Sequence, residues 1–392
     1  MEKLVSSWYN NVQPLPETYI FPPDARPGKL STLPSSDNIP VINLGGGGAE
    51  GHDRTRIVEQ ILGASQEFGF FQVINHGISE NLLHDTMDVF REFFALPPED
   101  KASFFSEDPN KLCRLITSTG NYDRENVHLW RDALRHPCHA LEKFIPLWPQ
   151  QPLKYREHVD KCSTQVRKVA LNILDSISEG LGIGYGHFSD ELSQETLLSV
   201  NHYPPCPDPS LTLGITKHCD PNLITILLQG DVHGLQVFKD GKWIGKVLNF
   251  GEVHRVWVWR ILITGLDLLC FGSSLFLLIY TFPYLGFNFQ DRFWILDPPL
   301  GVEPLPQGLV VNIGYQLQCA EHRAVTNSSN ARTSAAFFIA PSQDCHIQPA
   351  TALINASNPQ IYKGFQYKEF LSNYLMKQGN TEVVLEPFKL QI

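Results

Sequence analysis

The change in sequence texture near residue 195 is the feature that most constrains the fold. From there onward, short runs rich in Val, Ile, Leu and Phe alternate with turns that contain Pro, Gly and Asp. Clear examples are LLSVNHYPPCP, LITILLQ, GLQVFKDGKWIG, LVVNIGYQLQ and SAAFFIAP. Short strands separated by turn signals are typical of antiparallel β architectures. The C-terminal half is therefore predicted to form an antiparallel barrel or jelly roll.

Helical patterns dominate the first half of the chain instead. Apolar residues recur at helical spacing in residues 54–69, 81–97 and 155–182, and once more near the end in 367–377. Short strands are predicted at 39–44 and 70–77. We divide the chain into an N-terminal arm (1–37), an N-terminal region (38–150), a long helix and connector (151–194), a β-rich core (195–342) and a C-terminal helix and tail (343–392).

Composition and charge exclude several classes of protein. Hydrophobic residues make up 43% of the chain and charged residues 18%, as in a globular protein. The net charge of −10 and the lack of a basic run argue against a nucleic-acid binder, because phosphate contacts need clustered Lys and Arg. None of the eight cysteines forms a Cys-x-x-Cys pair, which argues against a zinc ribbon. The first residues lack an apolar leader, so a cytoplasmic location is expected.

An imidazole and a carboxylate stand two residues apart just before one of the apolar runs. They are His218 and Asp220, and residues i and i+2 of a strand project from the same face. A surface ion pair would explain this pair alone, but His322 supplies a third candidate ligand downstream. Two imidazoles and one carboxylate on one face of a metal are the arrangement of non-heme Fe(II) oxygenases. Zinc is the alternative, although it prefers a closed tetrahedron or a single open position.

Two further polar pairs share this period of two. Arg332 and Ser334 form one pair, and Asn201 and Tyr203 form the other. The guanidinium of Arg332 can bind a carboxylate through two parallel hydrogen bonds, and the hydroxyls of Ser334 and Tyr203 can add donors to it. A metal with open positions beside such a clamp predicts a small organic diacid, which chelates the metal at one end and is held at the other.

With these residues in place, the chain resembles the plant 2-oxoglutarate- and Fe(II)-dependent dioxygenases. It is most similar to the salicylate hydroxylase branch linked to downy mildew susceptibility, with hyoscyamine hydroxylase-like relatives nearby. The similar stretches span most of residues 12–377 and are FGFFQVINHGI, DPNKLCRLITSTGN, LWRDALR, VNHYPPCPDPSLTLG, HCDPNLITILLQ, GLQVFKDGKWIG, VVNIG, EHRAVTN and RTSAAFFIAP. The resemblance implies an α+β fold: a double-stranded β-helix (jelly-roll) core flanked by helices, with a helical N-terminal region.

The resemblance also implies roles for particular residues. The implied site consists of the iron ligands His218, Asp220 and His322 and the 2-oxoglutarate-binding residues Arg332, Ser334, Tyr203 and Asn201. Phe338 is a candidate for one wall of the substrate pocket, with core packing as the alternative. The expected cofactors are Fe(II), 2-oxoglutarate and O2, with ascorbate as a candidate reductant. The expected partner is a small phenolic or alkaloid-like substrate, bound by a monomer that engages neither nucleic acid nor membrane.

One segment departs clearly from the family pattern. Residues 246–301 separate GKWIG from VEPLP, and within them residues 268–290 carry no charge. Such a run is long enough to span a membrane, but a single span would place the two flanks of one barrel hairpin on opposite sides. We therefore interpret 246–301 as translated non-coding sequence, most simply a retained intron. A hydrophobic insertion and a membrane anchor are the alternatives.

A second departure lies just before His322. There YQLQ joins CAEHRAV directly, whereas relatives carry an additional short segment that leads into the histidine strand. A register shift of one residue turns a side chain to the opposite face of a sheet, so the position of His322 depends on this junction. Two alternative functions stay open: a catalytically impaired homologue or isoform, and an ethylene-forming-type oxidase that does not use 2-oxoglutarate.

Overall fold

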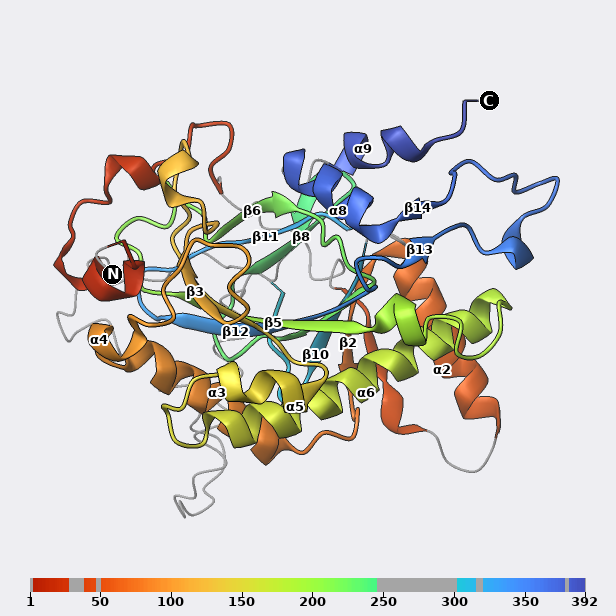
Figure 1. The fold of residues 1–392 in the computed structure, drawn as a ribbon, viewed down its shortest axis with the longest axis horizontal. Coiled ribbons are helices and arrows are strands. Elements are labelled where there is room, and N and C mark those ends of the chain that lie inside the picture. Colours follow the sequence, from red (N-terminus) through yellow and green to blue (C-terminus); the bar gives the residue numbers. More distant parts are fainter. Residues whose placement is uncertain are drawn as a thin grey trace, which may run out of the picture.

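Two β-sheets form the centre of the molecule (Figure 1). The computed structural model describes residues 3–27, 39–46, 51–244, 302–314, 320–377 and 381–391. The larger sheet has the strand order β1-β2-β10-β7-β12-β5-β4-β3, and the smaller has the order β6-β11-β8-β9. Apart from the parallel pair β1 and β2, the strand pairs within these two sheets are antiparallel. This is the predicted double-stranded β-helix (jelly-roll) core.

Most strands of the two sheets follow the runs read from the sequence, whereas β3 and β4 lie in stretches for which no strand was predicted. Those of the larger sheet are β1 (Val41–Asn43), β2 (Phe70–Ile74), β3 (Arg114–Thr117), β4 (Asp132–Pro137), β5 (Glu195–Tyr203), β7 (Ile224–Leu228), β10 (Leu309–Ile313) and β12 (Arg332–Ala340). Those of the smaller sheet are β6 (Ile215–His218), β8 (Leu235–Lys239), β9 (Lys242–Ile244) and β11 (His322–Ala324).

Three long helices cover one face of the larger sheet: α2 (Gly51–Glu67), α3 (Glu80–Ala95) and α6 (Tyr155–Leu181). Their ends follow local chemistry. The Ser79 hydroxyl accepts a hydrogen bond from the Leu82 amide at the start of α3. At the end of α6, Gly182 adopts a left-handed conformation with φ of +67°, which glycine tolerates without strain. The helices predicted in 54–69, 81–97 and 155–182 are confirmed.

Strand β12 shows how the period of two separates the two faces of the larger sheet. Ala335, Phe337 and Ile339 are buried in the apolar core beneath the helices. Because successive side chains alternate, Ser334 and Ala336 point the other way, toward the smaller sheet. That inner face carries the predicted site residues. A small apolar cluster joins residues of both sheets and of the loops beside them: Ile39, Phe70, Leu235, Val237, Val302, Val310 and Ala320.

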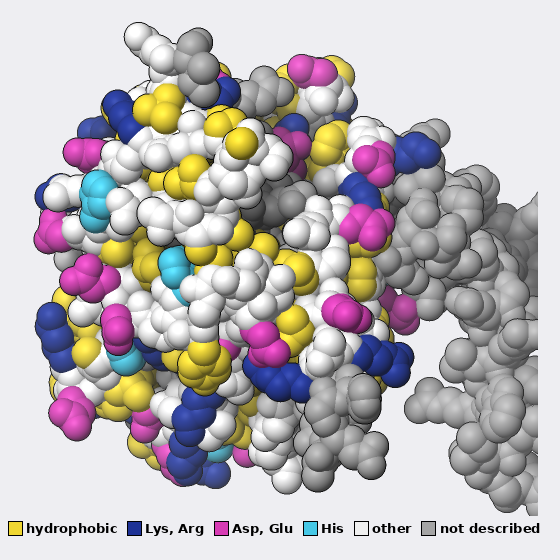
Figure 2. All heavy atoms as spheres, turned by 90° about the vertical axis from the view of Figure 1, so that its right-hand side faces the viewer, with side chains coloured by type: hydrophobic (Ala, Val, Ile, Leu, Met, Phe, Trp, Pro, Cys, Tyr) yellow, Lys and Arg dark blue, Asp and Glu magenta, His cyan; other side chains and the backbone are white. Residues whose placement is uncertain are grey.

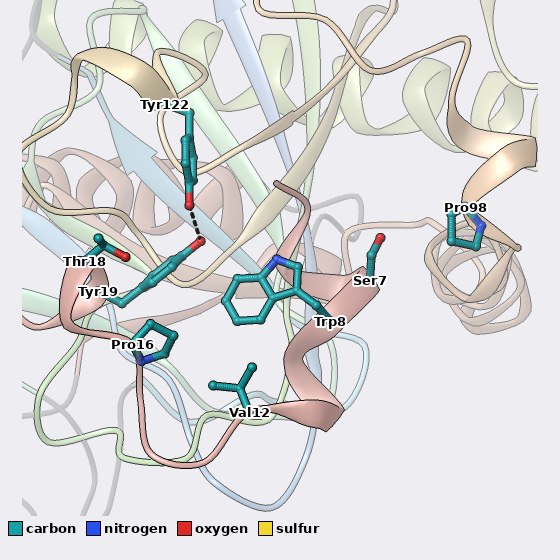
Figure 3. Close-up of a pocket in the computed structure, with 8 residues that line it drawn as sticks. All are labelled: Ser7, Trp8, Val12, Pro16, Thr18, Tyr19, Pro98 and Tyr122. Carbon is teal, nitrogen blue, oxygen red and sulfur yellow. Dashed lines mark hydrogen bonds between the residues drawn. The ribbon is translucent and has the colours of Figure 1, made fainter. Parts of the chain in front are cut away.

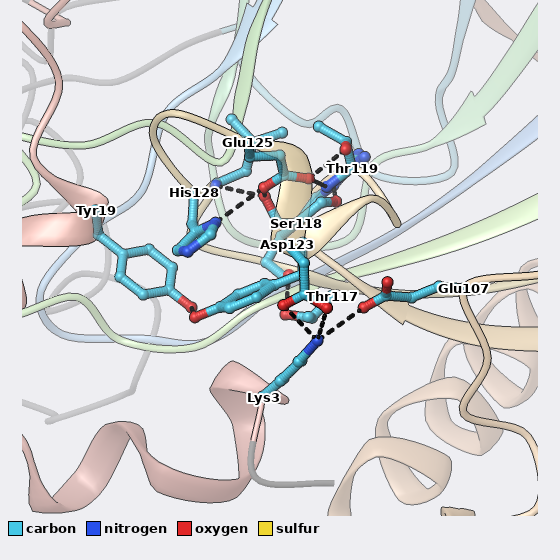
Figure 4. Close-up of polar contacts among 12 residues, drawn as sticks. Lys3, Tyr19, Glu107, Thr117, Ser118, Thr119, Asp123, Glu125 and His128 are labelled. Atoms are coloured by element: carbon cyan, nitrogen blue, oxygen red, sulfur yellow. Dashed lines mark hydrogen bonds and ion pairs between the residues drawn. The ribbon is translucent and has the colours of Figure 1, made fainter.

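The N-terminal segment is bound to the domain rather than extended freely. It contains the short helix α1 (Val5–Trp8), and its apolar side chains pack around the buried Trp130. The carboxylate of Asp132 is fully buried and accepts hydrogen bonds from the Val5 and Ser6 amides, at 3.1 and 2.8 Å. Lys3 adds ion pairs to Glu107 and Asp123 (Figure 4). The N-terminal arm predicted for 1–37 is therefore, over its described part, folded against the core.

The C-terminal region braces the segment that follows strand β6. It contains the small sheet of β13 (His346–Ile347) and β14 (Phe365–Gln366) and the helices α8 (Tyr367–Met376) and α9 (Thr381–Val384). The Tyr374 hydroxyl donates to the Cys219 carbonyl at 2.6 Å, and the Tyr367 hydroxyl donates to the Pro221 carbonyl at 3.2 Å. Helix α8 therefore holds the backbone on both sides of Asp220. The helix predicted at 367–377 is confirmed.

The two departures from the family pattern, at 246–301 and just before His322, fall largely on residues that the structure does not describe. Residues 246–301, including the uncharged run, lie outside the described residues, as does most of the junction before His322. Among the helices that the structure does describe, none is both long and apolar enough to cross a membrane. On the described part of the face in Figure 2, acidic and basic side chains are interspersed.

Candidate metal centre

The structure brings the three predicted ligands together between the two sheets. His218 ends strand β6, Asp220 lies two residues beyond it, and His322 begins β11, where it pairs directly with His218. Asp220 Oδ1 lies 3.6 Å from His218 Nε2 and 3.7 Å from His322 Nε2. One ligand atom from each residue lies within 4.8 Å of the others. The shortened junction left the register of His322 open. In the structure, the strand register turns the His322 ring toward His218 and Asp220.

Both imidazoles are oriented by backbone carbonyls. His218 Nδ1 lies 2.8 Å from the Thr216 carbonyl oxygen, and His322 Nδ1 lies 3.2 Å from that of Ala320. A carbonyl oxygen can only accept a hydrogen bond, so each Nδ1 carries the proton. Each Nε2 is left unprotonated beside Asp220, which is the tautomer that a metal ligand needs.

Asp220 is held by two residues that the sequence reasoning missed. Its Oδ2 atom accepts hydrogen bonds from Thr225 Oγ1 and Asn312 Nδ2, both at 2.7 Å. Thr225 lies on β7 and Asn312 lies directly opposite it on β10. These bonds occupy one carboxylate oxygen and leave Oδ1 facing the histidines. The sequence did contain a signal for Thr225 and Asn312: each is the single polar residue in an otherwise apolar strand.

Burial favours the neutral form of the histidine on β6. It lowers the pKa of His218 to about 4, and the neighbouring His322 ring adds to the effect while Asp220 opposes it. The two rings are close, with centroids 4.1 Å apart. Because a metal binds the unprotonated imidazole nitrogen, this environment favours the form that binds a cation.

The residues of the predicted carboxylate clamp lie on two directly paired strands. Arg332 on β12 lies opposite Tyr203 on β5, and Ser334 lies opposite Asn201. The Arg332 guanidinium carbon lies 5.2 Å from the Tyr203 ring centroid, and Nε donates to the Val232 carbonyl at 3.1 Å. Arg332 is 3% exposed, and burial lowers its pKa. In the described part of the chain it forms no ion pair, so its terminal nitrogens can receive an acid.

Asn201 differs from the other members of this group. Its Oδ1 atom accepts hydrogen bonds from Arg131 Nη1 at 3.2 Å and from Ser199 Oγ at 3.4 Å. The side chain thus joins the clamp to Arg131, just before β4, and to Ser199 on β5. Phe338 is partly buried and shares the inner face with Ser334, and it belongs to none of the apolar core clusters of the described residues.

A separate pocket lies beside the N-terminal segment. It has a volume of about 550 Å³, and Trp8, Tyr19 and Tyr122 turn their rings toward it (Figure 3). The two tyrosine hydroxyls lie 3.3 Å apart. None of the predicted site residues lines this pocket, so we assign it no part in the chemistry.

The site and fold can now be compared with known proteins. Residues 39–152 match the family model of the non-haem dioxygenase N-terminal region in morphine synthesis, and residues 194–257 match the 2OG-Fe(II) oxygenase superfamily. Rice flavanone 3-dioxygenase 2 is 35% identical over 96% of this chain and 94% of its own length. The chain belongs to the plant 2-oxoglutarate- and Fe(II)-dependent dioxygenases. It is thus an oxidoreductase by family.

Other members of this dioxygenase family match along nearly their whole length. Hyoscyamine 6-dioxygenase of Hyoscyamus niger is 34% identical, with all of both chains covered. The Arabidopsis thaliana protein DOWNY MILDEW RESISTANCE 6 is also 34% identical, with 98% of each chain covered. Among solved structures, JOX2 in complex with 2-oxoglutarate, iron and JA has a TM-score of 0.70 and 28% identity, covering 94% of this chain and 92% of JOX2.

The donor set of this dioxygenase fits the family's cofactors. Two imidazole Nε2 atoms and one carboxylate oxygen converge on one point, and these are the ligand types of the non-heme Fe(II) triad. The buried guanidinium of Arg332 fits the distal carboxylate of 2-oxoglutarate, because a buried cation needs an anionic partner. Fe(II) and 2-oxoglutarate are therefore the cofactors of this family that the described residues can hold.

Proposed function

We propose that this dioxygenase hydroxylates a small aromatic or other specialised metabolite. The observation that carries the proposal is the convergence of His218, Asp220 and His322 beside the buried Arg332. Bound Fe(II) and 2-oxoglutarate supply the oxidising chemistry with O2 in this family. The residues of this chain orient the participants and keep the reaction between the sheets, away from bulk water.

Each residue of the site has a proposed task. His218, Asp220 and His322 are the iron ligands, and Asp220 is kept in position by Thr225 and Asn312. Arg332 and Ser334 bind the distal carboxylate of 2-oxoglutarate, and the Tyr203 hydroxyl assists them. Asn201 positions the Arg131 side chain next to this clamp. Phe338 forms part of the wall against which the substrate packs.

Succinate release tests the proposal. The purified chain is incubated with Fe(II), 2-oxoglutarate, O2 and a panel of phenolic acids that includes salicylate, with and without ascorbate. We expect succinate to form in step with a hydroxylated product. Product formation without succinate would instead identify an oxidase of the ethylene-forming type, which does not use 2-oxoglutarate.

A catalytically impaired isoform is the second candidate. The superfamily match ends at residue 257, before His322 and Arg332, and the block 246–301 interrupts the pattern of the core. The same assay on a version that lacks 246–301 separates the two cases, because only an impaired chain gains activity from the deletion. Sequencing of transcripts across the Gly245–Val302 junction tests whether the block is a retained intron. We further propose a cytoplasmic monomer, which fractionation and light scattering can test.

A further inference from the structure

Two glycines lie on either side of strand β11 in the smaller sheet. Gly214 immediately precedes β6, and its amide donates to the Ala324 carbonyl at 2.9 Å. Gly234 immediately precedes β8, and its carbonyl accepts from the Val325 amide at 2.8 Å. Both glycines are buried, and neither has a positive φ, so a left-handed backbone conformation does not explain them. The space around each glycine does.

The ring of Tyr203 occupies the space that a side chain at Gly214 would need. A Cβ atom at Gly214 would be 2.5 Å from both Cδ1 and Cε1 of that ring. Carbon atoms in van der Waals contact are about 3.5–4.0 Å apart, so the ring could not keep its position beside any larger residue. Tyr203 is 2% exposed, and its hydroxyl interacts with both Arg131 and Arg332. These contacts leave the ring little room to move.

Arg332 uses the space at Gly234 in the same way. A Cβ atom at Gly234 would be 2.8 Å from Arg332 Cδ and 3.1 Å from Arg332 Nε. It would also be 3.0 Å from the Val325 carbonyl oxygen, a backbone atom that cannot rotate away. The bond from Arg332 Nε to the Val232 carbonyl, at 3.1 Å, lies two residues before this glycine. The arginine side chain therefore runs against the backbone that leads into β8.

The position of the carboxylate clamp thus depends on both sheets. Arg332 and Tyr203 lie opposite each other on β12 and β5 of the larger sheet, whereas the two glycines flank β11 of the smaller sheet. A methyl group at either glycine would displace a clamp residue without removing any of its hydrogen-bonding groups. Such a change alters where the donors lie and leaves their chemistry intact.

We propose that Gly214 and Gly234 are positioning residues of the 2-oxoglutarate site, where Gly214 makes room for the Tyr203 ring and Gly234 for the Arg332 side chain. This inference rests on the proposed function and deepens it. A glycine has no side chain with which to bind the cosubstrate, so each one acts only through its clamp residue. The defect of an alanine variant is therefore confined to recognition of the distal carboxylate.

Two keto acids separate this effect from general damage to the site. 2-Oxopentanoate has the same carbon chain as 2-oxoglutarate but ends in a methyl group in place of the distal carboxylate. The dissociation constants of both are measured by titration into the full, Fe(II)-loaded chain under anaerobic conditions. We expect the unaltered chain to prefer 2-oxoglutarate by about tenfold or more. Gly234→Ala and Gly214→Ala should each weaken 2-oxoglutarate by about tenfold and leave 2-oxopentanoate unchanged.

A double-variant cycle tests whether Gly234 acts through Arg332. In a chain that already carries Arg332→Gln the guanidinium is absent, so adding Gly234→Ala should not weaken 2-oxoglutarate further. Gly63→Ala is the matched control. It adds the same methyl group at an exposed position of α2, where a Cβ atom would meet nothing within 4 Å, and should change neither dissociation constant.

Several results would overturn the inference. Full affinity for 2-oxoglutarate in both alanine variants would show that the space is not needed, and equal weakening of both keto acids by Gly234→Ala would show a general disturbance. Loss of Fe(II) binding in Gly234→Ala would also count against it, because the defect would then extend beyond the clamp. So would an equal effect of Gly234→Ala with and without Arg332.

The proposed function fails in a different way. These titrations need no turnover, so a chain that shows the expected binding preferences but releases no succinate contradicts the proposed hydroxylation and leaves the role of the two glycines intact. Equal affinities of the unaltered chain for the two keto acids would remove the clamp itself, and this inference with it.

Discussion

Arg332 and Tyr203 face each other as direct partners on the antiparallel strands β12 and β5, with the guanidinium carbon 5.2 Å from the ring centroid. The same pairing places Ser334 opposite Asn201, two residues further along. Two polar pairs that are 131 residues apart in the chain thus form one polar surface between the sheets. Their shared orientation follows from the period of two in each strand, and their proximity follows from the register of the pairing.

The triad prediction concerns His322. His322→Ala removes one of three convergent ligands, so we expect stoichiometric Fe(II) binding to be lost while the fold is retained. Anaerobic Fe(II) titration measures binding, and circular dichroism checks the fold. The matched control is His187→Ala, at an exposed position outside the triad, and this variant should bind one equivalent of Fe(II). Unchanged binding in the His322 variant would show that the three residues are not the iron site.

Asn312 is expected to matter through Asp220. Asn312→Ala removes a 2.7 Å hydrogen bond to the carboxylate oxygen that faces away from the histidines. Loss of such a supporting bond typically weakens a metal site by about 10- to 100-fold, and we expect that range for the Fe(II) dissociation constant. Asn355→Ala, in an exposed turn, serves as control. An unaltered Fe(II) affinity in the Asn312 variant would count against this positioning role.

Two substitutions of Arg332 separate the contribution of its positive charge to 2-oxoglutarate binding from that of its planar guanidinium group. Arg332→Gln should weaken 2-oxoglutarate binding by about 10- to 100-fold, the factor expected when a charge-assisted pair of hydrogen bonds is lost. Arg332→Lys should recover part of the affinity, because it keeps the charge and loses the planar fork. Tyr203→Phe should have a smaller effect. Titration of 2-oxoglutarate into the Fe(II)-loaded chain measures all three, and a Gln variant with full affinity would refute the assignment.

Acid sensitivity should arise in part from His136, far from the metal centre. Its ring is fully buried against Tyr155 and Cys138, and burial lowers its pKa to about 4. Burial raises the pKa of both neighbours well above neutrality, so neither supplies charge in this range.

The direction of the effect follows from proton binding. Between about pH 6.5 and 4 the unfolded chain binds a proton at His136 that the folded chain does not, so stability falls as pH falls through that window. We expect a loss of roughly 2 kcal/mol from this group between pH 7 and 5. His136→Gln should be less stable at pH 7 but should show a shallower decline, as measured by urea unfolding. Equal slopes in the variant and the unaltered chain would contradict this expectation.

Local patterns in the sequence determined the elements and selected the residues that the structure brings together between the sheets. Helical spacing predicted α2, α3, α6 and α8, and turn-separated apolar runs predicted the β core. The period of two put Arg332 and Ser334 on one face because alternation is a property of a single strand. His218 and Asp220 also project together, although Asp220 lies just beyond the end of β6.

Only the tertiary structure decided which of these faces meet. Pairing of β11 with β6 brought His322 to His218, and pairing of β10 with β7 brought Asn312 beside Thr225 under Asp220. The placement of Gly214 against Tyr203 and of Gly234 against Arg332 likewise depends on how the two sheets pack. Such contacts join residues far apart in the chain, and their geometry depends on the packing of both sheets, which no short window of sequence contains.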